Sequence, residues 1–175
     1  MSTMLIVIGG LPGTGKTLLA RGLARALDAV HLRIDTIEQA LRSATMGSEA
    51  LGAAGYVVGY GVAADNLALG RTVVADGVNA LTSTRAAWRA VGERAAVTVV
   101  EVEVICSDAT EHRRRVESRS ADIPGLALPT WSNVGTRAYE RWDGEHLVID
   151  TARQPVEQGV TALHTFLLAR ERAVR

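Results

Sequence analysis

The chain has 175 residues, equal numbers of basic (Lys+Arg 19) and acidic (Asp+Glu 19) side chains, and 47% hydrophobic residues. This length predicts a single domain spanning 1–175, and the hydrophobic fraction excludes a disordered chain. The zero net charge disfavours proteins that bind nucleic acid or membrane surfaces through a strong basic field.

The single cysteine, Cys106, excludes an internal disulfide framework and reads as a buried small side chain. The N-terminus lacks a basic leader, and no run of 18 apolar residues could cross a membrane. We therefore expect a cytoplasmic protein without a membrane partner, either a monomer or a homodimer.

The first predicted elements are a strand over about 4–9, a glycine-rich loop and a helix over about 16–27. Within them, the residues from Gly10 to Thr17 fit the pattern G-x-x-x-x-G-K-[ST], the Walker A phosphate-binding loop. A glycine-rich turn without a ligand is the alternative, but the strand before and the helix after favour the phosphate loop. The predicted nucleotide-binding residues are Gly10, Leu11, Pro12, Gly13, Thr14, Gly15, Lys16, Thr17 and Leu18.

The chemistry of this loop explains its composition. Backbone N–H groups must converge on phosphate oxygens, so side chains are absent where the chain comes close to the ligand. The positive end of the following helix lies behind the anion. Lys16, the only lysine in the chain, would reach the β- and γ-phosphates, and the Thr17 hydroxyl would bind Mg²⁺.

The rest of the chain alternates between short apolar runs and helical periodicity, which predicts βαβ units and a parallel sheet with helices on both faces. The predicted strands after the first are 31–34, 72–76, 97–106 and 146–150. The predicted helices after the first begin at Thr36 and then span about 49–69, 83–94, 108–119, 130–141 and 155–173. Met46, Gly47 and Ser48 form a predicted loop, and 120–129 reads as a mobile loop.

Two of these segments carry unusual residues. The helix predicted over 49–69 contains four glycines, which suggest close packing, a bend or space for a ligand. The fourth strand carries Glu101 and Glu103 on one face, which is unfavourable in a buried strand. These carboxylates would lie at an exposed start of the strand or pair with arginines.

Acidic residues end three of the strands, namely Asp35, Asp76 and Asp150. Because ligands bind beyond the carboxyl ends of parallel strands, Asp35 and Asp76 should lie beside the bound phosphates. Asp76 could hold Mg²⁺, with an ordinary turn-capping Asp as the alternative. Asp35 could be the general base for an acceptor hydroxyl, with a helix N-cap as the alternative.

Four arginines, Arg113, Arg114, Arg115 and Arg119, precede the loop 120–129. They could form a solvated helix face or a nucleic-acid patch, although the absence of interleaved aromatics disfavours the patch. A third interpretation is a lid over about 111–130 whose guanidinium groups stabilise a phosphoryl group in transfer. Arg115 and Arg119 are four residues apart and can point the same way.

Several motifs together resemble the small P-loop kinases of the AAA-33 type, a group similar to chloramphenicol phosphotransferase, adenylylsulfate kinase, polynucleotide kinase and zeta toxin. The motifs are Gly-Gly-Leu-Pro-Gly-Thr-Gly-Lys-Thr at 9–17, Leu-Arg-Ile-Asp-Thr-Ile at 32–37, the segment 66–79, the arginine-rich helix, Tyr139-Glu-Arg-Trp142 and Ile149-Asp-Thr151. Ala80 and Arg141 depart from the group, which usually has proline at both positions.

The resemblance implies a P-loop three-layer sandwich with a five-stranded parallel sheet in the order 2-3-1-4-5, and ATP with Mg²⁺ as donor and cofactor. It implies Lys16 and Asp35 as catalytic residues, with Arg115 and Arg119 as lid arginines that contact phosphates. It further implies that Arg114 stacks on adenine and that Gln154 and Pro155 flank the base on its other side.

These observations favour an ATP-dependent kinase that phosphorylates a hydroxyl of a small molecule. Its acceptor pocket would lie between 49–69 and 77–84, with Asp35, Tyr56, Tyr60 and Asn79 as candidate contacts and Trp131 as a further one. Two alternatives stay open, namely a nucleic-acid or nucleotide-sugar kinase and a P-loop ATPase that acts as a switch.

Overall fold

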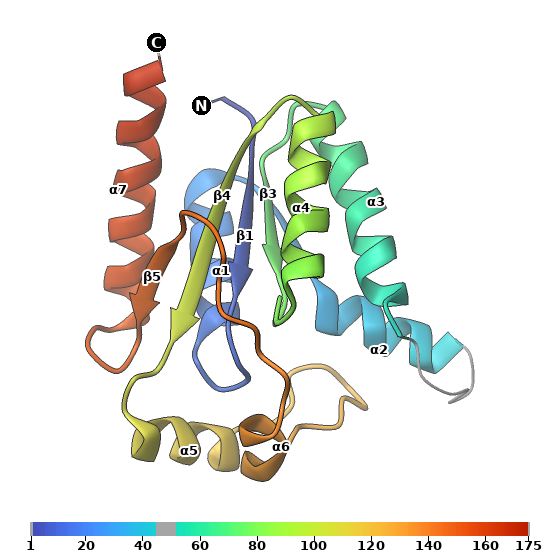
Figure 1. Ribbon diagram of the computed structural model, residues 1–175, viewed down its shortest axis with the longest axis vertical. Coiled ribbons are helices and arrows are strands. Elements are labelled where there is room, and N and C mark those ends of the chain that lie inside the picture. The colour runs from blue at the N-terminus through green and yellow to red at the C-terminus, as the bar shows by residue number, and fades with distance from the viewer. Residues whose placement is uncertain (1, 45–51, 175) are drawn as a thin grey trace.

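A five-stranded sheet organises the computed structural model, which describes residues 2–44 and 52–174. All strand pairs are parallel and the order is β2-β3-β1-β4-β5, which confirms the predicted topology (Figure 1). The strands are β1 Met4–Gly9, β2 Val30–Arg33, β3 Val73–Asp76, β4 Thr98–Ile105 and β5 Leu147–Asp150. The predicted loop at Met46–Ser48 and the first residues of the helix predicted over 49–69 lie outside the described residues.

Helices cover both faces of this sheet, as the alternating pattern predicts. The helices are α1 Lys16–Leu27, α2 Ile34–Ala44, α3 Ala54–Ala68, α4 Thr82–Arg94, α5 Ala109–Ser118, α6 Trp131–Gly135 and α7 Val156–Val174. Helices α1 and α7 pack together on one face, and α3 and α4 pack together on the other. Figure 1 shows α5 and α6 below the carboxyl ends of the strands, on the side away from both chain termini.

The central strand β1 is buried at every position because a helical layer lies on each of its faces. Met4, Ile6 and Ile8 point into the core under α1 and α7. Leu5 and Val7 point into the core under α3 and α4. Two cores therefore hold the strand whose carboxyl end leads into the glycine-rich loop.

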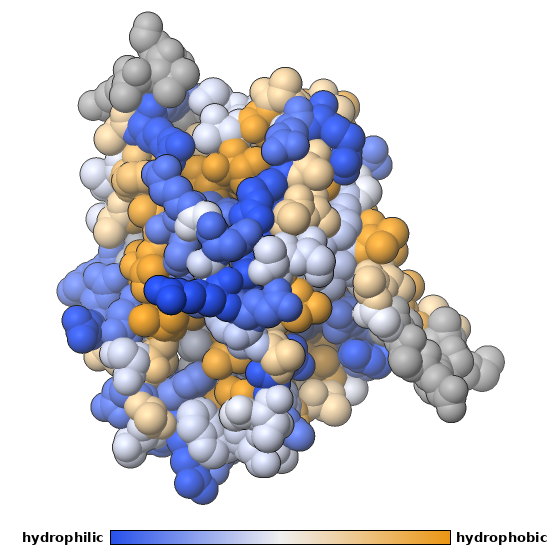
Figure 2. Space-filling model, in the orientation of Figure 1, coloured by the Kyte–Doolittle hydropathy of each residue, from blue (hydrophilic) through white to orange (hydrophobic). Residues whose placement is uncertain are grey.

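Gly55 and Gly59 of α3 serve close packing, whereas a Cβ added to Gly61 would meet nothing within 4 Å. A Cβ added to Gly59 would lie 2.8 Å from Cδ1 of Ile34, so only glycine lets α3 approach the start of α2 this closely. On its outer side α3 exposes Val57, Val58 and Val62. Figure 2 shows apolar surface along the flank of the molecule on which α3 lies.

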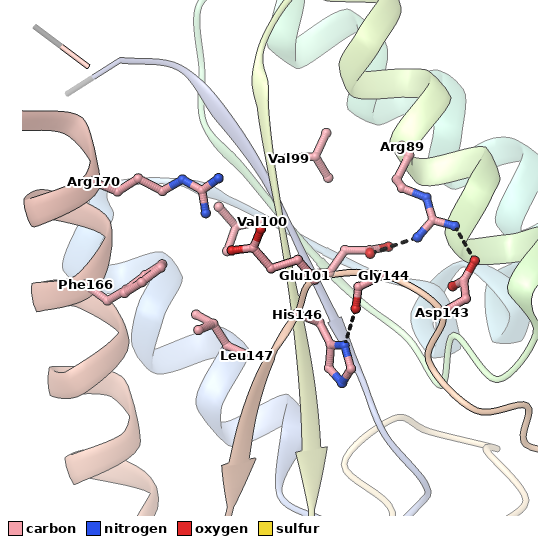
Figure 3. Close-up of a pocket in the computed structure, with 11 residues that line it drawn as sticks. Arg89, Val99, Val100, Glu101, Asp143, Gly144, His146, Leu147, Phe166 and Arg170 are labelled. Carbon is pink, nitrogen blue, oxygen red and sulfur yellow. Dashed lines mark hydrogen bonds and ion pairs between the residues drawn. The ribbon is translucent and has the colours of Figure 1, made fainter. Parts of the chain in front are cut away.

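Of the two glutamates of β4, Glu101 pairs with an arginine, as one of the two sequence interpretations expects, and Glu103 does not. Glu101 is buried, and its Oε2 accepts a hydrogen bond of 2.9 Å from Nη1 of Arg89, which also bonds Asp143 (Figure 3). Glu103 accepts a 2.9 Å hydrogen bond from the Tyr139 hydroxyl, and its other oxygen is 3.5 Å from His146. Arginine therefore neutralises Glu101, whereas a phenol and a histidine satisfy Glu103.

The helix predicted over 130–141 is wrong beyond its first turn, because α6 ends at Gly135. The buried guanidinium of Arg85 holds the following segment, since it donates hydrogen bonds to the carbonyl oxygens of Glu140 and Arg141. The backbone N–H of Glu140 donates to the carbonyl of Ala80 at 2.8 Å. A longer helix would need these backbone groups for its own hydrogen bonds. Because tertiary contacts occupy them, the helical pattern of the sequence is overridden here.

A second difference concerns Asp35. The expected strand ends at Arg33, and α2 begins at Ile34, so Asp35 lies in the first turn of a helix and not at the end of a strand. A carboxylate in this position is favoured by the positive end of the helix dipole. The carboxylate remains at the edge of the sheet where the sequence analysis places it.

The pairing of Glu101 yields a stability prediction. Arg89→Ala would leave a buried carboxylate without its cation. We expect the free energy of unfolding to fall by about 3 kcal/mol, the lower end for a broken buried pair, because Arg89 is partly exposed. Urea denaturation measures this change. Arg94→Ala, which removes an exposed arginine from the same helix, is the matched control, and equal effects of the two substitutions would contradict the prediction.

Candidate active site

The glycine-rich loop has a conformation that needs its glycines. Gly10, Gly13 and Gly15 have φ values of 146°, 86° and 90°, a region that residues with side chains rarely adopt. A Cβ on Gly13 would also lie 2.5 Å from Cγ2 of Val116 in α5. The backbone of the loop can therefore curve around an anion only with this sequence.

Contacts from distant segments fix the loop in place. His112 of α5 is buried and donates through Nε2 to the carbonyl of Pro12 at 2.8 Å. The Thr151 hydroxyl, which follows β5, donates to the carbonyl of Thr14 at 2.7 Å. Both carbonyls thus have partners on the protein. The N–H groups of Gly10 and Thr14 donate to the carbonyls of Val78 and Leu11, so a ligand would bind the other N–H groups of the loop.

Lys16 is buried, with 5% of its surface exposed, at the start of α1. Burial lowers the pKa of its ammonium group, while the nearby carboxylates of Asp76 and Asp35 act in the opposite direction. A cation in this position needs an anionic partner, and the phosphates of a nucleotide would supply one.

Thr17 and Asp76 meet beside Lys16. The Thr17 hydroxyl donates to Oδ1 of Asp76 at 3.3 Å, and Oδ2 of Asp76 is 3.2 Å from Nε2 of His31. Only 1% of Asp76 is exposed. A hydroxyl and a carboxylate in contact at the end of a phosphate loop suit Mg²⁺, which takes most of its remaining ligands from phosphate and water.

Thr17 and Asp76 would provide only two side-chain ligands for a metal ion. Among residues 2–44 and 52–174 there is no group of three or more His, Cys, Asp or Glu side chains that could hold a metal. The arrangement therefore fits an ion that enters with a nucleotide better than a metal held by a cage of protein side chains.

A cavity of about 680 Å³ opens in front of the loop. The predicted nucleotide-binding and lid residues that line this donor cavity are Gly13, Gly15, Lys16, Thr17, Leu18, Arg114, Arg115, Arg119, Gln154 and Pro155. Of the other loop residues, Gly10, Leu11 and Thr14 do not line it, and Pro12 lines a second cavity described below. The structure thus brings the P-loop, the arginine-rich helix and the segment after β5 around one space.

The lid arginines have different surroundings. Arg114 and Arg115 both pair with Glu111, and Arg115 also donates to the hydroxyl and the carbonyl of Thr151 at 2.8 and 3.0 Å. Arg119 has neither an ion pair nor a side-chain hydrogen bond within the described part of the chain, and burial lowers its pKa. Arg119 is therefore the member of the cluster whose guanidinium is free to bind a phosphate.

A cluster that the sequence analysis missed lies across the donor cavity. Asp122 accepts hydrogen bonds from Arg33 at 2.8 and 3.0 Å and from Arg21 at 2.6 Å. Arg33 is also 3.8 Å from Asp35 and 4.0 Å from Asp76, its partner in the β2–β3 register. Strand alternation places Arg33 on the same face as His31, which also contacts Asp76, but it gives no sign of the contacts to Arg21 and Asp122.

A second cavity of about 490 Å³ lies beside the first, and we call it the acceptor cavity after the ligand that the sequence analysis predicts here. Asp35, Glu38 and Tyr56 line it, together with Pro12 and Arg137. Residues common to both cavities mark the place where they meet. They are Lys16, Asp35, Arg119, Leu126 and Leu128.

Three other candidate acceptor contacts lie outside the lining of this cavity. The Asn79 amide is buried, where it donates to the carbonyl of Ile8 and accepts from Nε1 of Trp88. Tyr60 packs edge-on against Trp88, with ring centres 4.6 Å apart, and Trp131 packs against His112. These side chains stabilise the walls around the site.

Comparison with known proteins agrees with this geometry. The AAA_33 family, described as an AAA domain, matches residues 5–130. The chain belongs to the AAA_33 family. No curated protein matches the sequence.

Solved structures share the fold of this AAA_33 domain at low sequence identity. A candidate kinase from Chloroflexus aurantiacus has a TM-score of 0.74 at 20% identity, with 96% of this chain and 97% of that chain covered. The APS kinase of Mycobacterium tuberculosis, solved with AMPPNP and APS, has a TM-score of 0.67 at 18% identity, with 95% and 98% covered. A gluconokinase from Sinorhizobium meliloti has a TM-score of 0.63 at 20% identity, with 94% and 95% covered.

These likenesses confirm the P-loop kinase fold, and the APS kinase complex contains a nucleotide analogue. Within the described residues, none of the helices of the AAA_33 domain is long and apolar enough to cross a membrane.

Asp122 yields a prediction on acid stability. Hydrogen bonds from Arg33, and then from Arg21, lower the pKa of Asp122 from 3.8 to about 2. A depressed carboxylate pKa stabilises the fold above the unfolded value and loses this effect as pH falls towards the folded value. We therefore expect the urea midpoint of Asp122→Asn to fall less than that of the wild type between pH 4 and pH 2.

The control is Glu117→Gln, which removes an exposed carboxylate from α5 that is paired only with Arg113. Parallel acid profiles for the wild type and Asp122→Asn would show that the contact with Arg33 and Arg21 adds nothing to stability.

Proposed function

We propose that this protein is an ATP-dependent kinase that transfers the γ-phosphoryl group of Mg-ATP to a hydroxyl of a small-molecule acceptor. The observation that carries the proposal is the meeting of two cavities at Lys16, Asp35 and Arg119. A phosphoryl-transfer enzyme needs this arrangement, because donor and acceptor must approach each other in line with charged groups around the transferred phosphorus.

Each side chain at this meeting point has a role that follows from its surroundings. The buried Lys16 and the unpaired Arg119 would stabilise negative charge on the phosphoryl oxygens during transfer. Thr17 and Asp76 would hold Mg²⁺, which supplies charge neutralisation between the β- and γ-phosphates when bound.

Asp35 would act as the general base. Its carboxylate takes the proton of the acceptor hydroxyl while that oxygen forms a bond to the γ-phosphorus. The bond between the γ-phosphorus and the bridging oxygen of ADP breaks in the same transfer, so the products are ADP and a phosphate ester. Asp35 lines both cavities, as this role requires.

At the other end of the nucleotide, Arg114, Gln154 and Pro155 line the outer part of the donor cavity and would contact the adenine. Arg115 would act less directly than the resemblance implies, because its guanidinium holds Thr151 and thereby the P-loop carbonyl of Thr14. Lid closure over ATP would then bring Arg119 onto the phosphates.

The size of the acceptor cavity favours a small molecule over a nucleic-acid end, since about 490 Å³ is in the range of pockets for single small ligands. Its lining includes one aromatic side chain, Tyr56, so it lacks a platform for stacked bases.

The test is an acceptor screen read by ADP release and by phosphorus NMR of the product. Asp35→Asn should lower acceptor-dependent turnover by about 100-fold or more, because a general base typically contributes 10²–10⁴-fold, and should leave the affinity for an ATP analogue nearly unchanged. Lys16→Met should instead abolish binding of the analogue.

Asp65→Asn, an exposed carboxylate of α3 outside both cavities, is the matched control. Full acceptor-dependent turnover in Asp35→Asn would contradict its role as base. ATP hydrolysis that no acceptor stimulates would favour a P-loop ATPase switch over a kinase.

A further inference from the structure

One wall of the acceptor cavity is formed by α6 and the turn that follows it. Asn133 and Arg137 both line the cavity from this wall. A capping box fixes the start of α6, because Asn133 accepts from the backbone N–H of Thr130 through Oδ1 and donates to the Thr130 hydroxyl through its backbone N–H. Arg137 is held near by the hydrogen bond from its backbone N–H to the carbonyl of Val134.

No acidic side chain of the cavity lies within ion-pair distance of Arg137 in the described part of the chain. Lys16 and Arg119 lie where the cavity meets the donor cavity and serve the phosphates. Arg42 is 3.5 Å from Glu38. Within the described residues Arg137 makes no ion pair, and its influence on Glu38 is weaker than that of Arg42.

The neutral groups of the cavity suit a hydroxylated ligand. The Tyr56 hydroxyl accepts from the backbone N–H of Asn79 at 3.0 Å, so its own proton is available to donate into the cavity. Burial raises the pKa of Tyr56 to about 12, so this proton is retained at neutral pH. Opposite these polar groups, Ile34 and Val78 provide apolar surface.

We infer that the acceptor is a small hydroxylated anion, whose carboxylate, sulfate or phosphate group binds Arg137 while a hydroxyl faces Asp35. Arginine binds such groups with two parallel hydrogen bonds, which fixes the orientation of the ligand as well as its position. Anchoring one end at Arg137 presents the other end to the junction of the two cavities. This inference rests on the proposed kinase activity.

The experiment uses sets of acceptors that share a carbon skeleton: a neutral polyol, the corresponding hydroxy acid and the corresponding monophosphate. Each is assayed for ADP release with the intact protein, and for binding by thermal shift in the presence of a non-hydrolysable ATP analogue. We expect one anionic member of a set to exceed its neutral partner in kcat/KM by about 10- to 100-fold, the worth of one charge-assisted interaction.

Arg137→Gln should abolish this preference for the anion, and Arg137→Lys should restore part of it. Arg141→Gln, which removes an exposed arginine outside the cavity lining, is the matched control and should keep the preference. Comparing kcat/KM for the hydroxy acid and the monophosphate of each set shows which anion the site prefers.

The inference is overturned if neutral acceptors have the same kcat/KM as the corresponding acids, or if the preference for the anion persists in Arg137→Gln. Neither result would contradict the proposed kinase activity. If no anion in any set binds or is phosphorylated, the inference is likewise wrong. Stimulation of ADP release by acceptors of any charge then decides separately whether the proposed kinase activity holds.

Discussion

The structure depends on the burial of one ammonium group. Lys16 lies almost fully out of water, where its charged form is unfavourable unless anions surround it. In this fold the anions come from different parts of the chain, since Asp76 ends β3 and Asp35 opens α2. The strand order places β3 between β1 and β2, and so brings both carboxylates beside the loop that carries Lys16. The parallel sheet is therefore also the framework that makes a buried cation tolerable.

The parts of the fold that the sequence predicts are those set by local backbone requirements and by the spacing of apolar residues along strands and helices. Glycines that need positive φ, a strand buried on both faces and alternating helices predict the phosphate loop, the parallel sheet and its helical layers. The end of the helix predicted over 130–141 could not be judged in this way, because the buried Arg85, 55 and 56 residues away in sequence, donates to the carbonyls of Glu140 and Arg141. Local propensity contains no information about such a partner.

The same limit applies within the site. Lys16, Thr17, Asp35 and Asp76 follow from a motif or from strand ends, whereas the cluster of Arg21, Arg33 and Asp122 joins three segments that are separate in sequence. For Asn79 the sequence predicted a ligand contact that the structure does not show. Its buried amide instead bonds to the carbonyl of Ile8 in β1 and to Trp88 in α4. In both cases the deciding fact is which polar groups the fold brings within reach of one another, and that is known only once the fold is known.

The contact between His112 and Pro12 has a consequence for motion. This hydrogen bond and the close approach of Val116 to Gly13 fasten α5 to the glycine-rich loop, and Arg115 fastens it to Thr151. These contacts hold helix α5 against the sheet, so we expect any opening of the nucleotide entrance to occur in the segment 119–130 that follows it. Among the described residues, Asp122 is the side chain of this segment that bonds to the body of the domain, so we expect opening to break its hydrogen bonds to Arg21 and Arg33.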